Sequence, residues 1–211
     1  MFDENAKFPT ALRQKLLELD EIAWQLLRKS KEFGRTYIVT NASDGWVELS
    51  ARRFLPKTNR ELRDIEIISA RSRYESLFPR QYQRWKVEAF LEARKGLDEH
   101  TMTNVIALGD NMFEIEAAHV LGGKFTSSFI KTVKFRTGPS PNELIKQLNL
   151  VLLQFDFILF SPKNLTVRLL KSPGEGETGG ASGGKTLKEG ACDQATLAST
   201  QMMLNYNKKQ K

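Results

Sequence analysis

Two acidic residues follow the most apolar short strand that the sequence predicts. Residues 105–108 are apolar, Gly109 and Asp110 come next, and Glu114 lies four positions later in a helical pattern. Open α/β sheets place their sites at the carboxyl ends of buried parallel strands. Asp110 is therefore expected at a strand tip and Glu114 in the first turn of the following helix, where two carboxylates suit Mg²⁺. The residue types also allow a simpler interpretation, in which Asp110 caps the helix and Glu114 complements its dipole.

Positive charge gathers in one segment. Residues 52–86 hold ten lysines and arginines against four aspartates and glutamates, a local excess of six out of a formal net charge of +7. Such a basic segment can bind an anionic ligand, an acidic protein or nucleic acid. It can equally be a solvated face.

The elements that must position these residues alternate along the chain. A long amphipathic helix over 11–33 leads into a short strand at 37–39, and a helix over 46–54 follows. A second strand at 65–69 is followed by a loop over 71–79 and a helix over 81–95.

The alternation continues after the strand at 105–108, whose helix ends near residue 121. Residues 129–135 alternate apolar and polar side chains, as a half-buried or edge strand would. Pro141 introduces a helix that carries apolar residues as far as Phe155, and residues 157–160 and 165–170 are expected to add a strand or to pack as an extension. This succession predicts an α/β fold with a parallel sheet covered by helices on both faces.

Composition divides the chain into three parts. Residues 1–10 form a short polar segment and 11–170 the folded domain, while 171–211 are rich in Gly, Ser and Lys and are expected to be disordered, with a weak helix near 195–204. With one cysteine and no apolar run long enough to cross a bilayer, we expect no intrachain disulfide, no membrane segment and a cytoplasmic location. Residues 179–186 match a phosphate-loop pattern by letter, but the strand that such a loop needs is missing, so nucleotide binding by this tail remains a third hypothesis.

Taken together, Thr40 at the end of the first strand, Lys86 on the helix after the second, and Gly109-Asp110 with Glu114 after the third resemble three motifs of the haloacid dehalogenase-like superfamily, in order. The surrounding residues 38–42 and 106–110 strengthen the resemblance. It covers residues 11–155 and implies a Rossmann-like three-layer fold of the phosphatase type.

The resemblance also implies roles. Thr40, with Asn41 beside it, would hydrogen-bond a phosphoryl oxygen, and Lys86 would hold the phosphoryl group in place. Asp110 would ligate Mg²⁺ weakly, with Glu114 supporting it directly or through water. The ligand would be a phosphorylated small molecule or a phosphoprotein.

One family motif is missing from this sequence. The superfamily's first motif is a buried central strand ending in Asp-x-Asp, whose first aspartate attacks phosphorus. No such strand exists in residues 1–10, where Asp3-Glu4-Asn5 is the only acidic cluster. We therefore expect no catalytic nucleophile and negligible turnover, in either an inactive domain or a shortened form of a Mg²⁺-dependent phosphatase. The sheet should lack its central strand, so that its neighbours at 37–39 and 105–108 either pair with each other or stay unpaired. The alternative function is a non-enzymatic module that uses residues 52–86 to bind acidic proteins or, less expectedly, nucleic acid.

Overall fold

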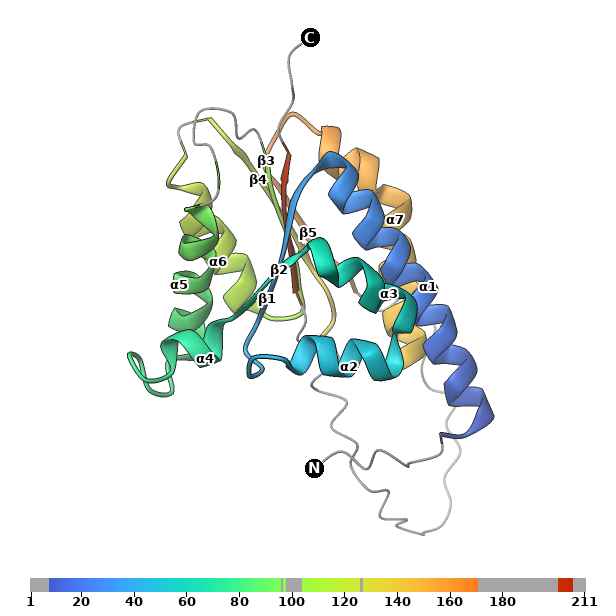
Figure 1. The fold of residues 1–211 in the computed structure, drawn as a ribbon. Helices are drawn as coiled ribbons and strands as arrows, with labels where there is room; N and C mark the ends of the chain where they lie inside the picture. Colours follow the sequence, from blue (N-terminus) through green and yellow to red (C-terminus); the bar gives the residue numbers. More distant parts are fainter. Residues whose placement is uncertain (1–7, 96, 98–103, 126, 171–200, 207–211) are drawn as a thin grey trace, which may run out of the picture.

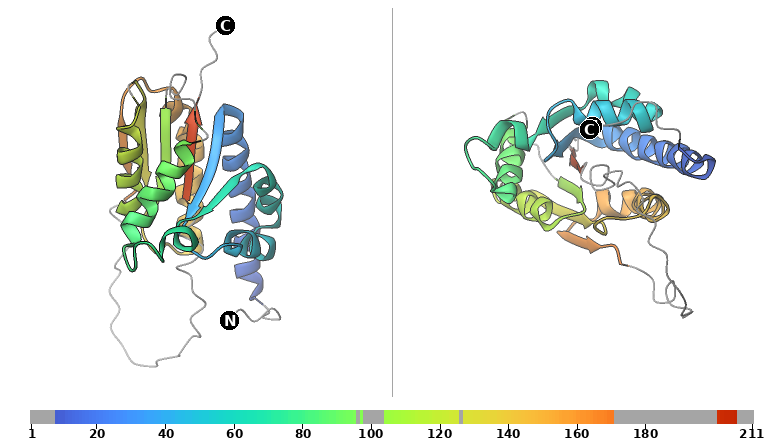
Figure 2. Two further views of the ribbon diagram at one scale, coloured as in Figure 1. Left: turned by 60° about the vertical axis from the view of Figure 1, so that its left-hand side comes forward. Right: turned by 90° about the horizontal axis from the view of Figure 1, so that it is seen from below.

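A six-stranded sheet covered by helices on both faces forms the centre of the chain (Figures 1 and 2). The computed structural model describes residues 8–95, 97, 104–125, 127–170 and 201–206. Its strands are β1 (Gly34–Thr40), β2 (Glu66–Ser69), β3 (Asn104–Gly109), β4 (Phe129–Lys134), β5 (Leu165–Arg168) and β6 (Gln201–Tyr206). They lie in the order β2-β1-β6-β3-β4-β5. The predicted α/β class is confirmed.

The helices fall into two layers. They are α1 (Thr10–Phe33), α2 (Trp46–Phe54), α3 (Pro56–Glu61), the 3₁₀ turn η1 (Leu62–Asp64), α4 (Ala70–Tyr74), α5 (Tyr82–Arg94), α6 (Met112–Gly122) and α7 (Pro141–Phe160). One apolar cluster joins α5 and α6 to β1 and β3, and includes Trp85 and Leu121. A second joins α1 and α7 to β3 and β4, and includes Leu26 and Phe155. None of the helices within the described part of the chain is long and apolar enough to cross a membrane.

Several element ends differ from the sequence-based expectation. Residues 70–74, expected partly as a loop, form α4, because the Ser69 side chain accepts a hydrogen bond from the Ser72 amide and caps it. Pro56, expected to end a helix, instead begins α3, where its missing N–H costs nothing. The last turn of α7 runs to Phe160, past the expected loosening at Phe155.

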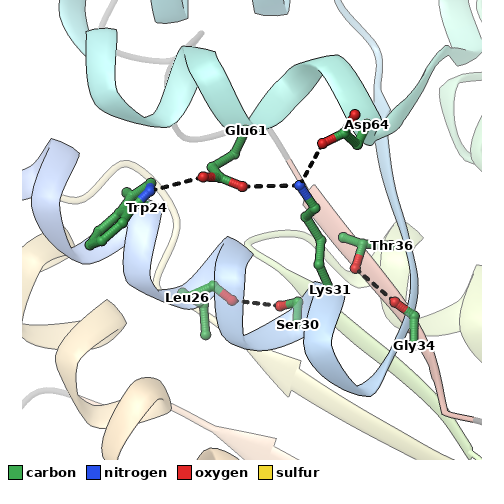
Figure 3. A network of polar contacts seen from close by, with 8 residues as sticks. All are labelled: Trp24, Leu26, Ser30, Lys31, Gly34, Thr36, Glu61 and Asp64. Carbon is green, nitrogen blue, oxygen red and sulfur yellow. Dashed lines mark hydrogen bonds and ion pairs between the residues drawn. The ribbon is translucent and has the colours of Figure 1, made fainter.

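Helix α1 is fastened to α3 by polar contacts from two directions. The buried carboxylate of Asp20 accepts hydrogen bonds from the amides of Lys57 and Thr58, at 2.8 and 2.7 Å, and so caps α3 from the neighbouring helix. Further along, Glu61 accepts from Trp24 and Lys31, both at 3.0 Å (Figure 3). The Lys31 ammonium group holds the pKa of the Glu61 carboxyl below its usual range. These contacts fix α3 against α1 along its length.

Strand β4 is an interior strand, and the expectation of a half-buried or edge strand is wrong. It pairs in parallel with β3 on one side and β5 on the other. The polar residues that suggested an edge are buried: Lys131 and Thr132 are both 0% exposed. Lys131 donates from Nζ to the carbonyl of Leu159 at 2.6 Å, which satisfies an acceptor at the end of α7.

The position expected to be empty, between β1 and β3, is occupied by β6 (Figure 2, left). Its backbone runs antiparallel to both neighbours, so β1 and β3 are parallel to each other. The neighbouring strands therefore neither close up nor remain unpaired. Residues 201–204 are strand, where a weak helix was expected. The rest of the predicted tail, including the phosphate-loop pattern at 179–186, lies outside the described residues, as does the Asp3-Glu4-Asn5 cluster.

Candidate anion site at the carboxyl edge of the sheet

The predicted site residues meet at one edge of the sheet. Thr40 ends β1, and Asp110 directly follows β3. Because these strands are parallel and separated only by β6, their carboxyl ends lie about 10 Å apart, two interstrand spacings. Lys86 reaches this edge from α5, on the face that α5 and α6 cover (Figure 1).

Lys86 links the two halves of the site. Its Nζ donates a hydrogen bond of 2.7 Å to the carbonyl of Val39 on β1. The same atom lies 3.7 Å from Glu114 Oε1, on the helix after β3. The two side chains are only 1% and 3% exposed. Removal of Lys86 from water lowers its pKa to about 8, although the nearby charges of Glu114 and Asp110 oppose the shift. This is a buried cation held among a carbonyl and two carboxylates.

The first turn of α6 explains how Glu114 comes to face Lys86. Asn111 is the N-cap, and its side chain accepts from the Phe113 amide while Glu114 Oε2 accepts from the Asn111 amide at 2.9 Å. Glu114 is thus a first-turn acid of the helix, as the simpler interpretation expected. The expected cap was wrong, because the N-cap is Asn111 and not Asp110. Both carboxylate oxygens of Glu114 therefore have partners within the protein.

A close backbone approach makes this arrangement possible. A Cβ added at Gly109 would lie 2.8 Å from Glu114 Cβ and 2.9 Å from its Cγ. Only glycine leaves room for the Glu114 side chain to fold back over the end of β3. The Gly-Asp sequence at 109–110 is therefore needed for packing as well as for the chemistry that it suggested.

The loop after β3 is fixed by the loop after β4. The carbonyl of Asp110 accepts from Thr137 Oγ1 at 2.7 Å and from Lys134 Nζ at 3.2 Å. Asp110 itself is half-buried, so its carboxylate lies at the boundary between the buried lysine and solvent. The Lys134 ammonium group places a second cation close to this loop.

The loop after β1 is held from β2. Thr40 Oγ1 accepts from the Ala42 amide at 3.0 Å, and Ser69 Oγ donates to the Ala42 carbonyl at 2.7 Å. Thr40 is 1% exposed, and no acceptor for its hydroxyl proton lies within hydrogen-bonding distance among the described residues. Ser69, which the sequence reading did not single out, could have been noticed as the polar residue ending the second strand.

Asn41 carries an unsatisfied group. Its Oδ1 is buried and has no hydrogen-bond partner within the described part of the chain. A buried polar atom of this kind is costly unless something pairs with it. It lies next to Thr40, at the edge where a ligand would enter.

The donor set fits Mg²⁺ only as a largely hydrated ion. No group of three or more His, Cys, Asp or Glu side chains is placed to hold a metal among the residues that the structure describes. Glu114 is engaged by Lys86 and by Asn111, so Asp110 is the residue that would contact the ion, and Glu114 would act through water.

Comparisons of the chain with protein-family models, with curated proteins and with solved structures found no match.

Proposed function

We propose that the chain is a haloacid dehalogenase-like domain that binds the phosphate group of a small molecule or a phosphoprotein without hydrolysing it. The observation that carries the proposal is the position of Lys86, whose Nζ bridges the end of β1 and the Glu114 carboxylate. Three sequence-distant motifs supply Thr40, Lys86 and Asp110 to the same edge, in keeping with the resemblance in their order along the chain.

A phosphate group would approach from the half-buried rim of this site. Thr40 and Lys86 are buried, whereas Asn41 and Asp110 are half-buried. The Thr40 hydroxyl can donate to a phosphoryl oxygen, and the charges of Lys86 and Lys134 favour an anion. The Asp110 carboxylate opposes one. Bound Mg²⁺ would supply the positive charge that offsets this carboxylate, so we expect phosphate binding to strengthen with Mg²⁺.

Turnover is not expected, because none of the described residues places an acid in the attacking position. The strand between β1 and β3 begins at this edge with Gln201, whose amide is not a nucleophile. Of the two acids that the site does hold, Glu114 is buried in an ion pair with Lys86. A phosphoryl transfer through an aspartyl intermediate needs a carboxylate placed to attack phosphorus.

The test is a calorimetric titration of the full chain with inorganic phosphate, with and without Mg²⁺, together with an assay on p-nitrophenyl phosphate. We expect saturable phosphate binding that Mg²⁺ strengthens, that Asp110→Asn weakens under those conditions, and that the matched surface variant Asp64→Asn leaves unchanged. No hydrolysis is expected. Absence of phosphate binding to the unmodified chain would refute the proposal, and so would Mg²⁺-dependent hydrolysis that survives Asp3→Ala but is lost in Asp110→Ala.

A basic surface supports a second candidate, binding of an acidic protein. Within α2, α3 and η1, three exposed arginines have no acidic side chain within 4 Å among the described residues: Arg52, Arg60 and Arg63. They come from α2, α3 and η1, which follow one another beside α1 (Figure 1). By contrast Arg71, Arg73 and Arg84 are neutralised by ion pairs with glutamates, so only part of the 52–86 segment carries an unbalanced charge.

This candidate makes a separate prediction. Binding to an acidic polypeptide such as polyglutamate should weaken steeply with salt, and replacement of Arg52, Arg60 and Arg63 by glutamine should remove it. Asp110→Asn should leave that binding unchanged. Binding that ignores both salt and these three arginines would exclude this surface.

A further inference from the structure

The space between β1 and β3, here called the strand slot, is formed by parts of the molecule other than its occupant. On one face, α1 packs on β1 and against α7, which covers β3 and β4. On the other face, α5 contacts β1 and α6, and α6 contacts β3 and β4. Lys86 also bonds to β1 and reaches Glu114 beyond β3. The two parallel half-sheets, β2-β1 and β3-β4-β5, are therefore connected by helices on both faces as well as by β6.

The strand in the slot, β6, forms main-chain hydrogen bonds with β1 on one side and with β3 on the other. Residues 201–206 pair with residues 34–39 of β1, and residues 202–206 pair with 104–108 of β3. Main-chain pairing of this kind is available to any extended peptide that lacks proline, which is how an added strand binds in β-augmentation. β6 runs antiparallel to β1 and β3, which are parallel to each other. It is therefore not joined to either neighbour by the crossover connection that parallel strands need, and an occupant of the slot does not require such a connection.

The walls of the slot restrict the composition of the occupant. The flanking residues of β1 and β3 are buried, including Ile38, Val39, Val105 and Ile106. A charged residue in the middle of an inserted strand would be removed from water without a partner. The resident sequence, Gln-Met-Met-Leu-Asn-Tyr, is uncharged, as this surrounding requires.

An apolar cavity of about 160 Å³ lies next to the slot, on the α1 face. Its lining includes Leu26 from α1, Ile38 from β1 and Phe135, the residue after β4. Residues paired across neighbouring strands share a face of the sheet. A peptide position opposite Ile38 would therefore face this cavity, which has space for a larger apolar side chain.

The resident strand is joined to the rest of the domain by a long connection. Thirty residues, 171–200, separate Leu170 from Gln201, and seven of them are glycine. At up to about 3.3 Å per residue, thirty residues can span enough distance for residues 201–206 to leave the slot while β5 stays in place. A strand tethered to its own slot has an effective concentration of roughly millimolar there, so a free peptide competes well only when the resident strand is weakened.

We propose that the strand slot is a peptide-binding site, that residues 201–206 are its replaceable resident, and that an extended, uncharged peptide rich in Met and Leu can take their place. This proposal does not depend on phosphate binding. It assigns to the chain an interaction with an unfolded or terminal segment, made by strand insertion into the centre of the sheet rather than at its edge.

The first test weakens the resident strand in the full chain. Met203→Pro removes a main-chain donor from the middle of β6, whereas the control Lys208→Pro changes the same tail outside the strand. A labelled peptide with the sequence of residues 200–207 should bind Met203→Pro at least about tenfold more tightly than it binds the unmodified chain or the control. Phenylalanine at the peptide position corresponding to Met202 should tighten binding further by filling the cavity, and alanine there should weaken it.

No peptide binding to a folded Met203→Pro chain, or equal binding to all three chains, would overturn the proposal. If Met203→Pro does not fold, a second measurement decides. In a Cys192→Ser background, Ile38→Cys with Met202→Cys places two thiols at paired positions. We expect an intramolecular disulfide, with amide exchange in residues 34–39 and 104–108 at least about tenfold slower when oxidised than when reduced. Failure to form the disulfide, or equal exchange in the two states, would overturn the replaceable strand.

Discussion

The molecule contains two buried lysines that resemble each other except in their neighbours. Lys86 and Lys131 are 1% and 0% exposed, and each donates from Nζ to a main-chain carbonyl, that of Val39 and of Leu159. Burial lowers the pKa of each lysine to about 8. Lys86, however, faces the carboxylates of Glu114 and Asp110, whereas burial is the only cause of the shift at Lys131. The comparison separates a lysine that closes the end of a helix from one that organises a charged site.

The largest expected effect is on stability. Lys86→Met leaves Glu114 as a buried charge without its cation and should lower the free energy of unfolding by about 3–5 kcal/mol. Lys131→Met removes one hydrogen bond to the end of α7 and replaces a buried cation by an apolar chain of similar size, so the change should be about 1 kcal/mol or less. Urea unfolding of the two variants measures the difference. Equal losses would mean that the carboxylates beside Lys86 do not matter.

The pH dependence of stability tests whether Lys131 is desolvated in the folded chain. A lysine whose folded-state pKa is about 8 and whose unfolded value is 10.5 binds fewer protons when folded, so its contribution to stability rises as the pH increases from 8 to 10.5. The unmodified chain should therefore gain about 2–3 kcal/mol relative to Lys131→Met across this range. Urea midpoints at pH 7.5 and 10 provide the measurement. No relative gain would show that Lys131 is not held as a desolvated cation.

Gly109 should contribute to the stability of the chain because the side chain of Glu114, the partner of Lys86, packs closely against it. Gly109→Ala introduces a Cβ within 3 Å of two Glu114 carbons and should destabilise by about 1–3 kcal/mol. Gly123→Ala is the control, because its added Cβ would meet only ordinary contacts at 3.6 Å. Thermal unfolding of both variants decides. If the two changes were equally mild, the close approach of Glu114 to β3 would be incorrect.

The smallest effect concerns a single charge. Asp110→Asn removes one of the two carboxylates that oppose the shift at Lys86, so the pKa of Lys86 should fall further, by less than about one pH unit. The pKa of Lys131 should not change. A ¹⁵N titration of the lysine side chains measures both in one experiment, and a fall at Lys131 as well would point to a general change of fold.

The sequence predicted the convergence of the site better than its internal contacts. Thr40 and Asp110 could be placed at one edge because each ends an apolar strand in a parallel alternation, and Lys86 followed from its helix. Their partners could not be predicted. The Lys86 pairing with Val39 and Glu114 depends on how α5 packs against α6, which no local pattern specifies.

Long-range pairing explains the other differences. The lysine at position 131 led us to expect a half-exposed strand at 129–135. The neighbouring sequence does not show that its ammonium group donates a hydrogen bond to the last turn of α7. The insertion of β6 joins residues 201–206 to residues 34–39, across most of the chain, and its short uncharged sequence is compatible with helix or strand. We expected an empty central position because residues 1–10 contain no apolar strand, but residues 201–206 occupy that position in the sheet.

The central claim is that Thr40, Lys86 and Asp110 form one phosphate-binding edge. A titration of the ¹⁵N-labelled full chain with inorganic phosphate in the presence of Mg²⁺ tests it most directly. We expect the amide signals of Thr40, Asn41 and Asp110 and the side-chain signal of Lys86 to shift together, with one shared affinity. Shifts confined to Arg52, Arg60 and Arg63, or none at all, would contradict it.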